Sequence, residues 1–115
     1  MTEGDEAARV ADALTEAART MFVRGFGGVI RVEATDKGAA FWVDGRGEDA
    51  VVTRQAPAEV DGAFCLWRAR HETLTRMLAE RGRRVDAAFV SNRLQISGDM
   101  AVMARLEVGQ PEAPA

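Results

Sequence analysis

The sequence predicts an α+β fold, with a single, mostly antiparallel five-stranded sheet and helices packed on one face. Apolar side chains recur every three or four residues near the N-terminus and again beyond residue 70, whereas in between they alternate with polar ones. The alternating segments are joined by short, glycine-containing turns, which favour antiparallel hairpins. Strands and helices that are segregated along the chain are typical of α+β folds.

Length and composition favour one domain. The chain has 115 residues, of which 47% are hydrophobic and 29% are charged. This is enough to bury one core and too little for two. We therefore expect one domain over residues 1–115, with its core at about 3–108 and a flexible tail at 109–115.

Residues 3–24 are predicted to form an amphipathic helix. Charged residues occupy much of one side, and three glycines at positions 25, 27 and 28 end the helix in a turn. The apolar face has residues at helical spacing, namely Ala7, Val10, Ala11, Leu14, Ala18, Met21 and Phe22.

Four strands are predicted after this turn, at residues 29–34, 39–44, 50–54 and 63–67. Short turns connect the first three, and residues 55–61 form a looser link to the fourth. In the fourth strand the period of two places Phe64 and Leu66 on one face and Cys65 on the other. We expect Phe64 and Leu66 to point toward the helices.

Helical spacing returns after the fourth strand with Leu74, Met77 and Leu78. A short helix at 85–90, a fifth strand at 93–97 and a final helix are predicted to follow. Asp99 is the expected N-cap of the final helix, because its carboxylate accepts hydrogen bonds from free backbone N–H groups.

The composition excludes several classes of function. A net charge of −3 indicates no general affinity for nucleic acid. No apolar run approaches the roughly 18 residues that span a bilayer, and the N-terminus is acidic where a secretory signal would be basic, so we expect a cytoplasmic protein without stable membrane insertion. With one Cys and one His, we expect no disulfide, no metal site and no cofactor.

Cys65 and His71 are the candidates for nucleophilic catalysis. A Cys–His pair requires the two side chains to meet in space. Cys65 is predicted to lie within a strand, where a small buried residue is the usual explanation, and His71 lies near the start of a helix. We therefore predict no catalytic residues and no enzymatic activity.

A basic cluster at the end of the next helix has two interpretations. It consists of Arg76, Arg81, Arg83 and Arg84. Cations at a helix C-terminus interact favourably with the helix dipole, so a solvated helix end is the first interpretation. The alternative is contact with anionic lipid headgroups or with a coenzyme A phosphate.

The remaining candidates are apolar. Methionine is flexible and suits irregular apolar guests, and ligand cavities are lined mostly by apolar side chains. From composition alone, such a layer can be a filled core or a hollow ligand site. The residues expected to line a ligand site are Phe41, Val43, Phe64, Leu66, Leu74, Met77, Leu78, Phe89, Leu94, Ile96, Met100, Met103 and Ala104.

Beyond residue 85 the pattern becomes specific, with a short helix ending near Phe89, then Asn92-Arg93-Leu94, a short strand, Gly98-Asp99 and a helix carrying Met100 and Met103. This pattern resembles the end of sterol carrier protein type 2 (SCP-2) domains, in which a helix ending in Phe leads into Gly-Arg/Lys-Leu, a strand, Gly-Asp and a Met/Ala/Leu helix. Residues 40–44 and 61–66 look like the family's second and fourth strands. The order of elements also agrees, so the resemblance covers roughly residues 10–108.

The resemblance implies a sheet covered by helices on one face, with an apolar tunnel between them. In that family the tunnel binds sterols, fatty acids, fatty acyl-CoA or isoprenoid lipids without covalent chemistry. For this chain it implies that the inward residues line the tunnel and that Arg83 and Arg84 meet a headgroup. One departure is that the Ser or Thr that caps the helix after the fourth strand is lost or shifted, because the sequence there reads Ala69-Arg70.

Two functions follow from the resemblance. The first is a free-standing bacterial protein that binds or transfers a lipid and touches membranes transiently. A fatty acyl chain or a quinone precursor fits this better than a sterol, because the Arg-rich, Lys-poor composition points to a bacterial source. The second is an accessory module of the same fold, which docks a lipid or quinone biosynthetic enzyme or forms a homodimer.

Overall fold

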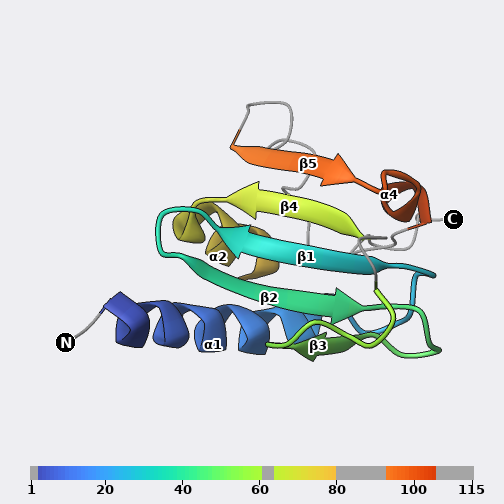
Figure 1. Ribbon diagram of the computed structural model, residues 1–115, viewed down its shortest axis with the longest axis horizontal. Helices are drawn as coiled ribbons and strands as arrows, with labels where there is room; N and C mark the ends of the chain where they lie inside the picture. The colour runs from blue at the N-terminus through green and yellow to red at the C-terminus, as the bar shows by residue number, and fades with distance from the viewer. Residues whose placement is uncertain (1–2, 61–63, 80–92, 106–115) are drawn as a thin grey trace, which may run out of the picture.

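The computed structural model describes residues 3–60, 64–79 and 93–105, which form a five-stranded sheet with helices packed against it (Figure 1). The elements follow in the order α1 (Glu3–Met21), β1 (Val29–Ala34), β2 (Ala39–Asp44), β3 (Val51–Thr53), β4 (Cys65–Ala69), α2 (His71–Ala79), β5 (Leu94–Gly98) and α4 (Ala101–Arg105). The predicted helix at 85–90 lies outside the described residues.

The strand order is β3-β2-β1-β4-β5, and the sheet is mixed. β1 pairs with β4 in parallel, whereas β1 with β2, β2 with β3 and β4 with β5 pair antiparallel. From β1 the chain forms two antiparallel strands on one side, β2 and then β3, so β3 runs in the same direction as β1. It then crosses to the other side of β1 and forms β4, which also runs in that direction. The predicted α+β fold with a mostly antiparallel five-stranded sheet is confirmed.

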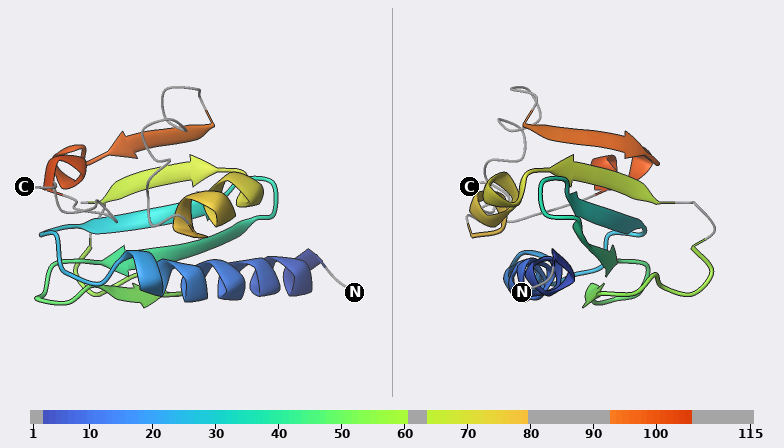
Figure 2. Two further views of the ribbon diagram at one scale, coloured as in Figure 1. Left: turned by 180° about the vertical axis from the view of Figure 1, so that it is seen from behind. Right: turned by 60° about the vertical axis from the view of Figure 1, so that its left-hand side comes forward.

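The two faces of the sheet are covered differently. Helices α1 and α2 lie over one face, and residues 54–60 pass over the other (Figure 2). Alternation along β1 shows the division: Ile30 and Val32 are buried in the main core on the helix-covered face, whereas Arg31 and Glu33 are half-buried on the opposite face. We call these the helix face and the open face.

The predicted apolar stripe of α1 packs on the helix face. Leu14, Ala18 and Met21 are buried in the main core. The helix ends at Met21, before the predicted end at 24, because the chain must turn sharply there. A Cβ on Gly25 would lie 1.8 Å from the backbone oxygen of Gly47, so only a glycine permits this close approach.

The fourth strand corrects one prediction. Phe64 and Leu66 were expected to point toward the helices, but Cys65, Trp67 and Ala69 occupy the main core instead. Phe64 packs on the open face, in a second cluster that also contains Trp42. The period of two was right and the choice of face was wrong, because Arg68 shares the side of Leu66 and cannot be buried among apolar side chains.

Candidate functional site

The helix face brings together most of the apolar residues that the sequence singled out. Phe41 and Val43 from β2, with Leu94 from β5, are fully buried in the same core cluster as the side chains of α2. Ile96 and Met103 are partly buried and pack on the same cluster. The α2 residues in this layer are Leu74, Met77 and Leu78.

Trp67 is a central member of this layer, and the sequence interpretation missed it. The side chain is completely buried, and its ring lies 5.9 Å from the ring of Phe22, centroid to centroid. Its indole N–H donates to the sulfur of Met103 at 3.2 Å, which satisfies the ring's one polar atom without water. The sequence signal that could have identified Trp67 is the charged Arg68 beside it. Arg68 must face solvent, and neighbouring residues of a strand point to opposite faces, so Trp67 faces the core.

Helix α4 closes one end of the layer and is held by close packing. Val102 is fully buried, and a Cβ on Gly28 would lie 2.6 Å from Val102 Cγ2. The predicted cap is confirmed, since the backbone N–H of Ala101 donates to Asp99 Oδ1 at 3.1 Å. The glycine at position 28 therefore allows α4 to sit directly on the sheet.

Several predicted lining residues are not part of this layer. Phe64 and Leu66 lie on the open face, as described above. Met100 is 47% exposed, because it precedes the first turn of α4 and points away from the core. Phe89, Arg83, Arg84 and the side chain of Ala104 lie outside the described residues.

His71 has a structural role at the start of α2. Its backbone N–H donates to Asp36 Oδ1 at 2.8 Å, and its ring Nδ1 lies 2.8 Å from Asp36 Oδ2. Burial acts to raise the pKa of Asp36, but the hydrogen bonds from His71 outweigh it and hold that pKa below its usual range. Asp36, in the turn after β1, thus supplies the helix cap that the sequence around Arg70 lacks.

Cys65 and His71 do not form a nucleophile–base pair. Cys65 begins β4 and His71 follows its end, and a strand rise of about 3.3 Å per residue puts the two ends of β4 about 13 Å apart. The thiol is completely buried, and burial raises its pKa, which is the opposite of what an activated thiol requires.

The described residues contain neither a metal-binding cluster nor a membrane-spanning helix. Nowhere in residues 3–60, 64–79 and 93–105 do three His, Cys, Asp or Glu side chains gather as a metal site requires. Within the same ranges, no helix combines the length and apolarity needed to cross a membrane.

Comparison with known proteins agrees with this architecture. The sequence matches the SCP-2 sterol transfer family over residues 9–108. The chain belongs to the SCP-2 family. Domains of this family are typically non-catalytic. Among curated proteins, none matches the sequence.

Two solved structures show the same fold. One is described as "UbiJ-SCP2 Ubiquinone synthesis protein"; it is 18% identical, with a TM-score of 0.52, and the match covers 86% of this chain and 87% of that one. The other is sterol carrier protein 2 from Yarrowia lipolytica in its apo form. It is 13% identical, with a TM-score of 0.52, and the match covers 89% of this chain and 80% of that one. At these identities the likeness shows the fold alone.

Proposed function

We propose that this SCP-2 domain binds, without catalysis, a hydrophobic lipid between the helices and the sheet. The observation that carries this proposal is the helix face itself, where apolar side chains from separate strands and helices converge in a layer without charges. Family membership supports the same conclusion. The proposed lining comprises Phe41, Val43, Trp67, Leu74, Met77, Leu78, Leu94, Ile96 and Met103.

Burial of apolar surface supplies the affinity in this mechanism. Each methylene group that leaves water contributes about 0.8 kcal/mol, so a chain of ten methylenes gains about 8 kcal/mol before ordering costs are subtracted. Met77 and Met103 adapt their side-chain torsions to the guest, because methionine is unbranched.

The ligand class follows from this lining. A fatty acid, a fatty acyl-CoA, an isoprenoid quinone or a sterol-like molecule each present a long apolar surface, which the layer accepts with its adaptable side chains. The predicted headgroup contacts at Arg83 and Arg84 belong to the same proposal and lie outside the described residues.

Native mass spectrometry of the purified full chain tests this function. We expect lipid-sized adducts, or uptake of added palmitic acid at one molecule per chain. A Met77→Asp variant, which places a charge in the layer, is expected to lose the adduct, whereas Arg76→Gln on the exposed side of the same helix retains it. Circular dichroism verifies that both variants fold. A chain that stays free of bound lipid and of added palmitic acid contradicts the proposal.

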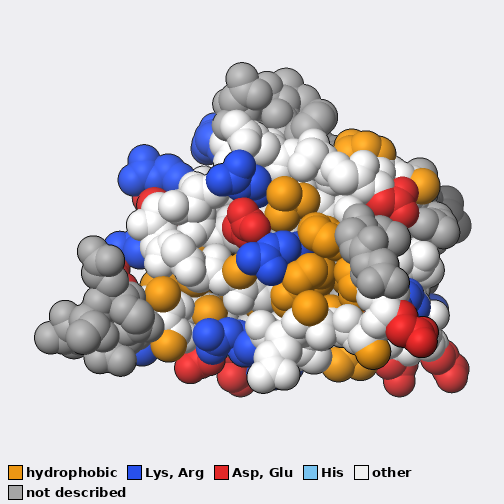
Figure 3. Space-filling model, viewed as in Figure 1, with side chains coloured by type: hydrophobic (Ala, Val, Ile, Leu, Met, Phe, Trp, Pro, Cys, Tyr) orange, Lys and Arg blue, Asp and Glu red, His pale blue; other side chains and the backbone are white. Residues whose placement is uncertain are grey.

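A second candidate function is an accessory docking module, and the open face favours it. Apolar side chains gather at the centre of this face, surrounded by charged ones (Figure 3). Trp42 and Phe64 pack together there, and Val51 at the sheet edge is 53% exposed. The shared fold with a ubiquinone synthesis protein suggests a biosynthetic enzyme as partner.

Light scattering and an interface variant distinguish this second function from lipid carriage. A specific homodimer must bury at least about 1,000 Å². We expect Val51→Glu to convert a dimer to monomer without changing lipid uptake. A wild-type chain that is monomeric at all concentrations rules out the homodimer.

A further inference from the structure

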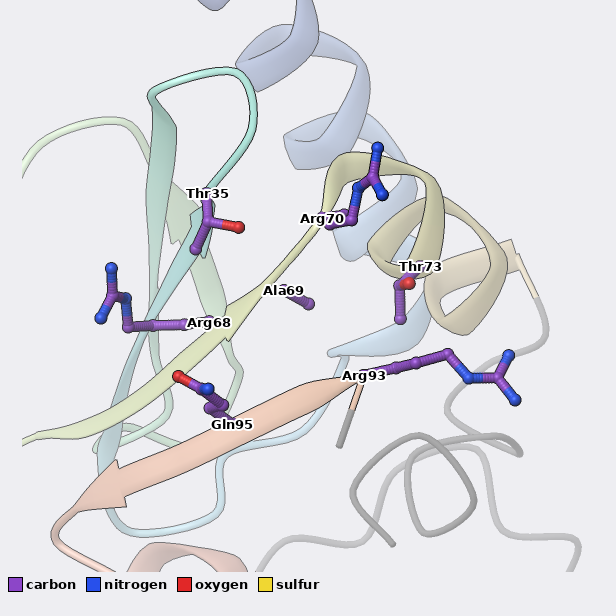
Figure 4. Close-up of a pocket in the computed structure, with 7 residues that line it drawn as sticks. All are labelled: Thr35, Arg68, Ala69, Arg70, Thr73, Arg93 and Gln95. Carbon is purple, nitrogen blue, oxygen red and sulfur yellow. The ribbon is translucent and has the colours of Figure 1, made fainter. Parts of the chain in front are cut away.

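A pocket of about 320 Å³ opens at one end of the sheet (Figure 4). β1 and β4 are parallel and both end there, and β5 begins there because it runs antiparallel to β4. Helix α2 starts at the same place. The pocket is lined by Thr35, Arg68, Ala69, Arg70, Thr73, Arg93 and Gln95.

The polar groups around this pocket are suited to an anion. Among the described residues, its lining contains three guanidinium groups, two hydroxyls, one amide and no carboxylate. Arginine presents a planar set of donors that binds phosphate in a bidentate manner, and threonine hydroxyls add further donors. A cationic lining of this kind favours a phosphate group over a neutral ligand.

Arg70 turns to a ligand more readily than Arg68 does. Its side chain is 75% exposed, and its Nε lies 3.9 Å from Asp36 Oδ2, beyond hydrogen-bond distance. That carboxylate is already bonded to the backbone and ring of His71. Arg68 is held more firmly, because its Nε lies 3.1 Å from Glu33 Oε1. In Figure 4 the three guanidinium groups stand at the rim and point in different directions, so binding requires them to turn toward a shared anion.

The pocket also adjoins the proposed lipid layer. Ala69 lines the pocket and is a buried member of the main core, where it pairs across the sheet with the fully buried Leu94. A phosphate at this end of the sheet would therefore lie next to apolar side chains. We propose that the pocket binds a phosphate group, carried by the headgroup of the bound lipid or by a free phosphate compound. The lipid form of this inference rests on the proposed function.

Titration of the ¹⁵N-labelled full chain, followed by nuclear magnetic resonance, tests the site with three probes. Inorganic phosphate carries the anion alone, dihexanoyl phosphatidic acid carries it with short acyl chains, and dioctanoylglycerol carries acyl chains without phosphate. We expect inorganic phosphate to shift the signals of Thr35, Thr73 and the Arg70 side chain. Arg70→Gln should weaken phosphate binding about threefold or more, and added salt should weaken it further.

The matched control is Arg76→Gln. Arg76 lies on α2, the helix that Arg70 directly precedes, is similarly exposed and is not among the residues that line the pocket, so the variant removes the same charge elsewhere. It should leave phosphate binding unchanged. Equal weakening by Arg70→Gln and Arg76→Gln, or shifts spread evenly over all exposed arginines, would show general charge attraction and overturn the site.

The remaining outcomes separate the source of the phosphate and the two proposals. Phosphatidic acid that binds at least about tenfold more tightly than inorganic phosphate, with the same loss in Arg70→Gln, identifies a lipid headgroup. Equal affinity of these two probes identifies a free phosphate compound. Uptake of dioctanoylglycerol without any response to phosphate overturns this inference and leaves the lipid function intact. Binding of phosphate that depends on Arg70, without uptake of either lipid, supports the phosphate site and contradicts the proposed lipid binding.

Discussion

The two faces of the sheet are built from the same strands but differ in the burial and charge of their side chains. On the helix face, alternate residues of all five strands are apolar and buried under α1, α2 and α4. On the open face, β1, β2 and β4 carry both apolar and charged residues. Arg31 lies 5.1 Å above the ring of Trp42, and Glu33 pairs with both Arg31 and Arg68.

This difference shows which face suits which partner. The described residues of the helix-face core are apolar, which suits the proposed acyl chain, because no polar group among them would lose its water when the chain enters. The open face combines half-buried ion pairs with apolar side chains, a mixture that is typical of protein interfaces. The proposed lipid binding on the helix face and the proposed docking on the open face are therefore compatible with each other in one domain.

The largest expected difference between the faces comes from their two tryptophans. Trp67→Ala should lower the free energy of unfolding by about 3–5 kcal/mol, because it leaves a cavity where a large, completely buried side chain was. Trp42→Ala should cost less, because its ring packs in a much smaller cluster, with Val29, Val60 and the partly buried Phe64. Urea denaturation of both variants measures the difference. Equal losses would show that the open face is also a closely packed core.

A smaller effect is expected where α4 meets the sheet. Gly28→Ala should lower the free energy of unfolding by about 1–3 kcal/mol, because the added methyl group overlaps Val102. Val102→Ala in the same chain should restore part of the loss, since it removes the clashing atoms. A double-mutant cycle in urea gives the coupling between the two positions. Purely additive losses would mean that α4 does not rest on Gly28.

The next effect concerns Asp36, which caps the start of α2 on the helix face. Asp36→Ala should lower the free energy of unfolding by about 1 kcal/mol, whereas Asp36→Asn, which still accepts a hydrogen bond, should lose less. The folded-state pKa of Asp36 lies below its usual value of 3.8. The charged cap therefore stabilises the fold above that value, and its contribution is lost as the pH falls through the lower folded-state pKa.

Urea denaturation at several pH values checks that the stabilisation by Asp36 is lost on acidification. The difference in stability between wild type and Asp36→Asn should be greatest near neutral pH and shrink toward strongly acidic pH. A difference that stays constant or grows on acidification would contradict the role of the carboxylate at the start of α2.

The smallest effect is expected from the ion pairs of the open face. Glu33→Gln should change the free energy of unfolding by about 1 kcal/mol or less, because the pairs with Arg31 and Arg68 are partly exposed. The change should diminish in high salt. A salt-independent loss of several kcal/mol would place these charges in a dry environment and remove the contrast between the faces.

Sequence periodicity predicted local elements well and their surroundings less well. The stripe containing Leu14 and Ala18 and the cap by Asp99 were predicted correctly, because both depend on residues within a few positions of each other. Phe64 and Leu66 were placed on the wrong face, because a period of two defines two faces without saying which is covered. Arg68 carried the missing information, since a charge avoids the apolar side.

The candidate site shows the same limit. The residues Leu74, Met77 and Leu78 were predicted from helical spacing and do face the layer. Trp67 was missed because its importance comes from Phe22 and Met103, which are distant in sequence. Met100 was placed on the stripe of a helix that in fact begins one residue later.

The sequence by itself determined the fold class, the SCP-2 resemblance and the positions of most helices and strands, because these follow from local periodicity and short motifs. Only the tertiary structure decided the parallel pairing of β1 with β4, and with it the pocket where both strands end. It also decided that Asp36 caps a helix 35 residues further on. Such contacts join residues that no local pattern relates, so only the folded chain brings them together.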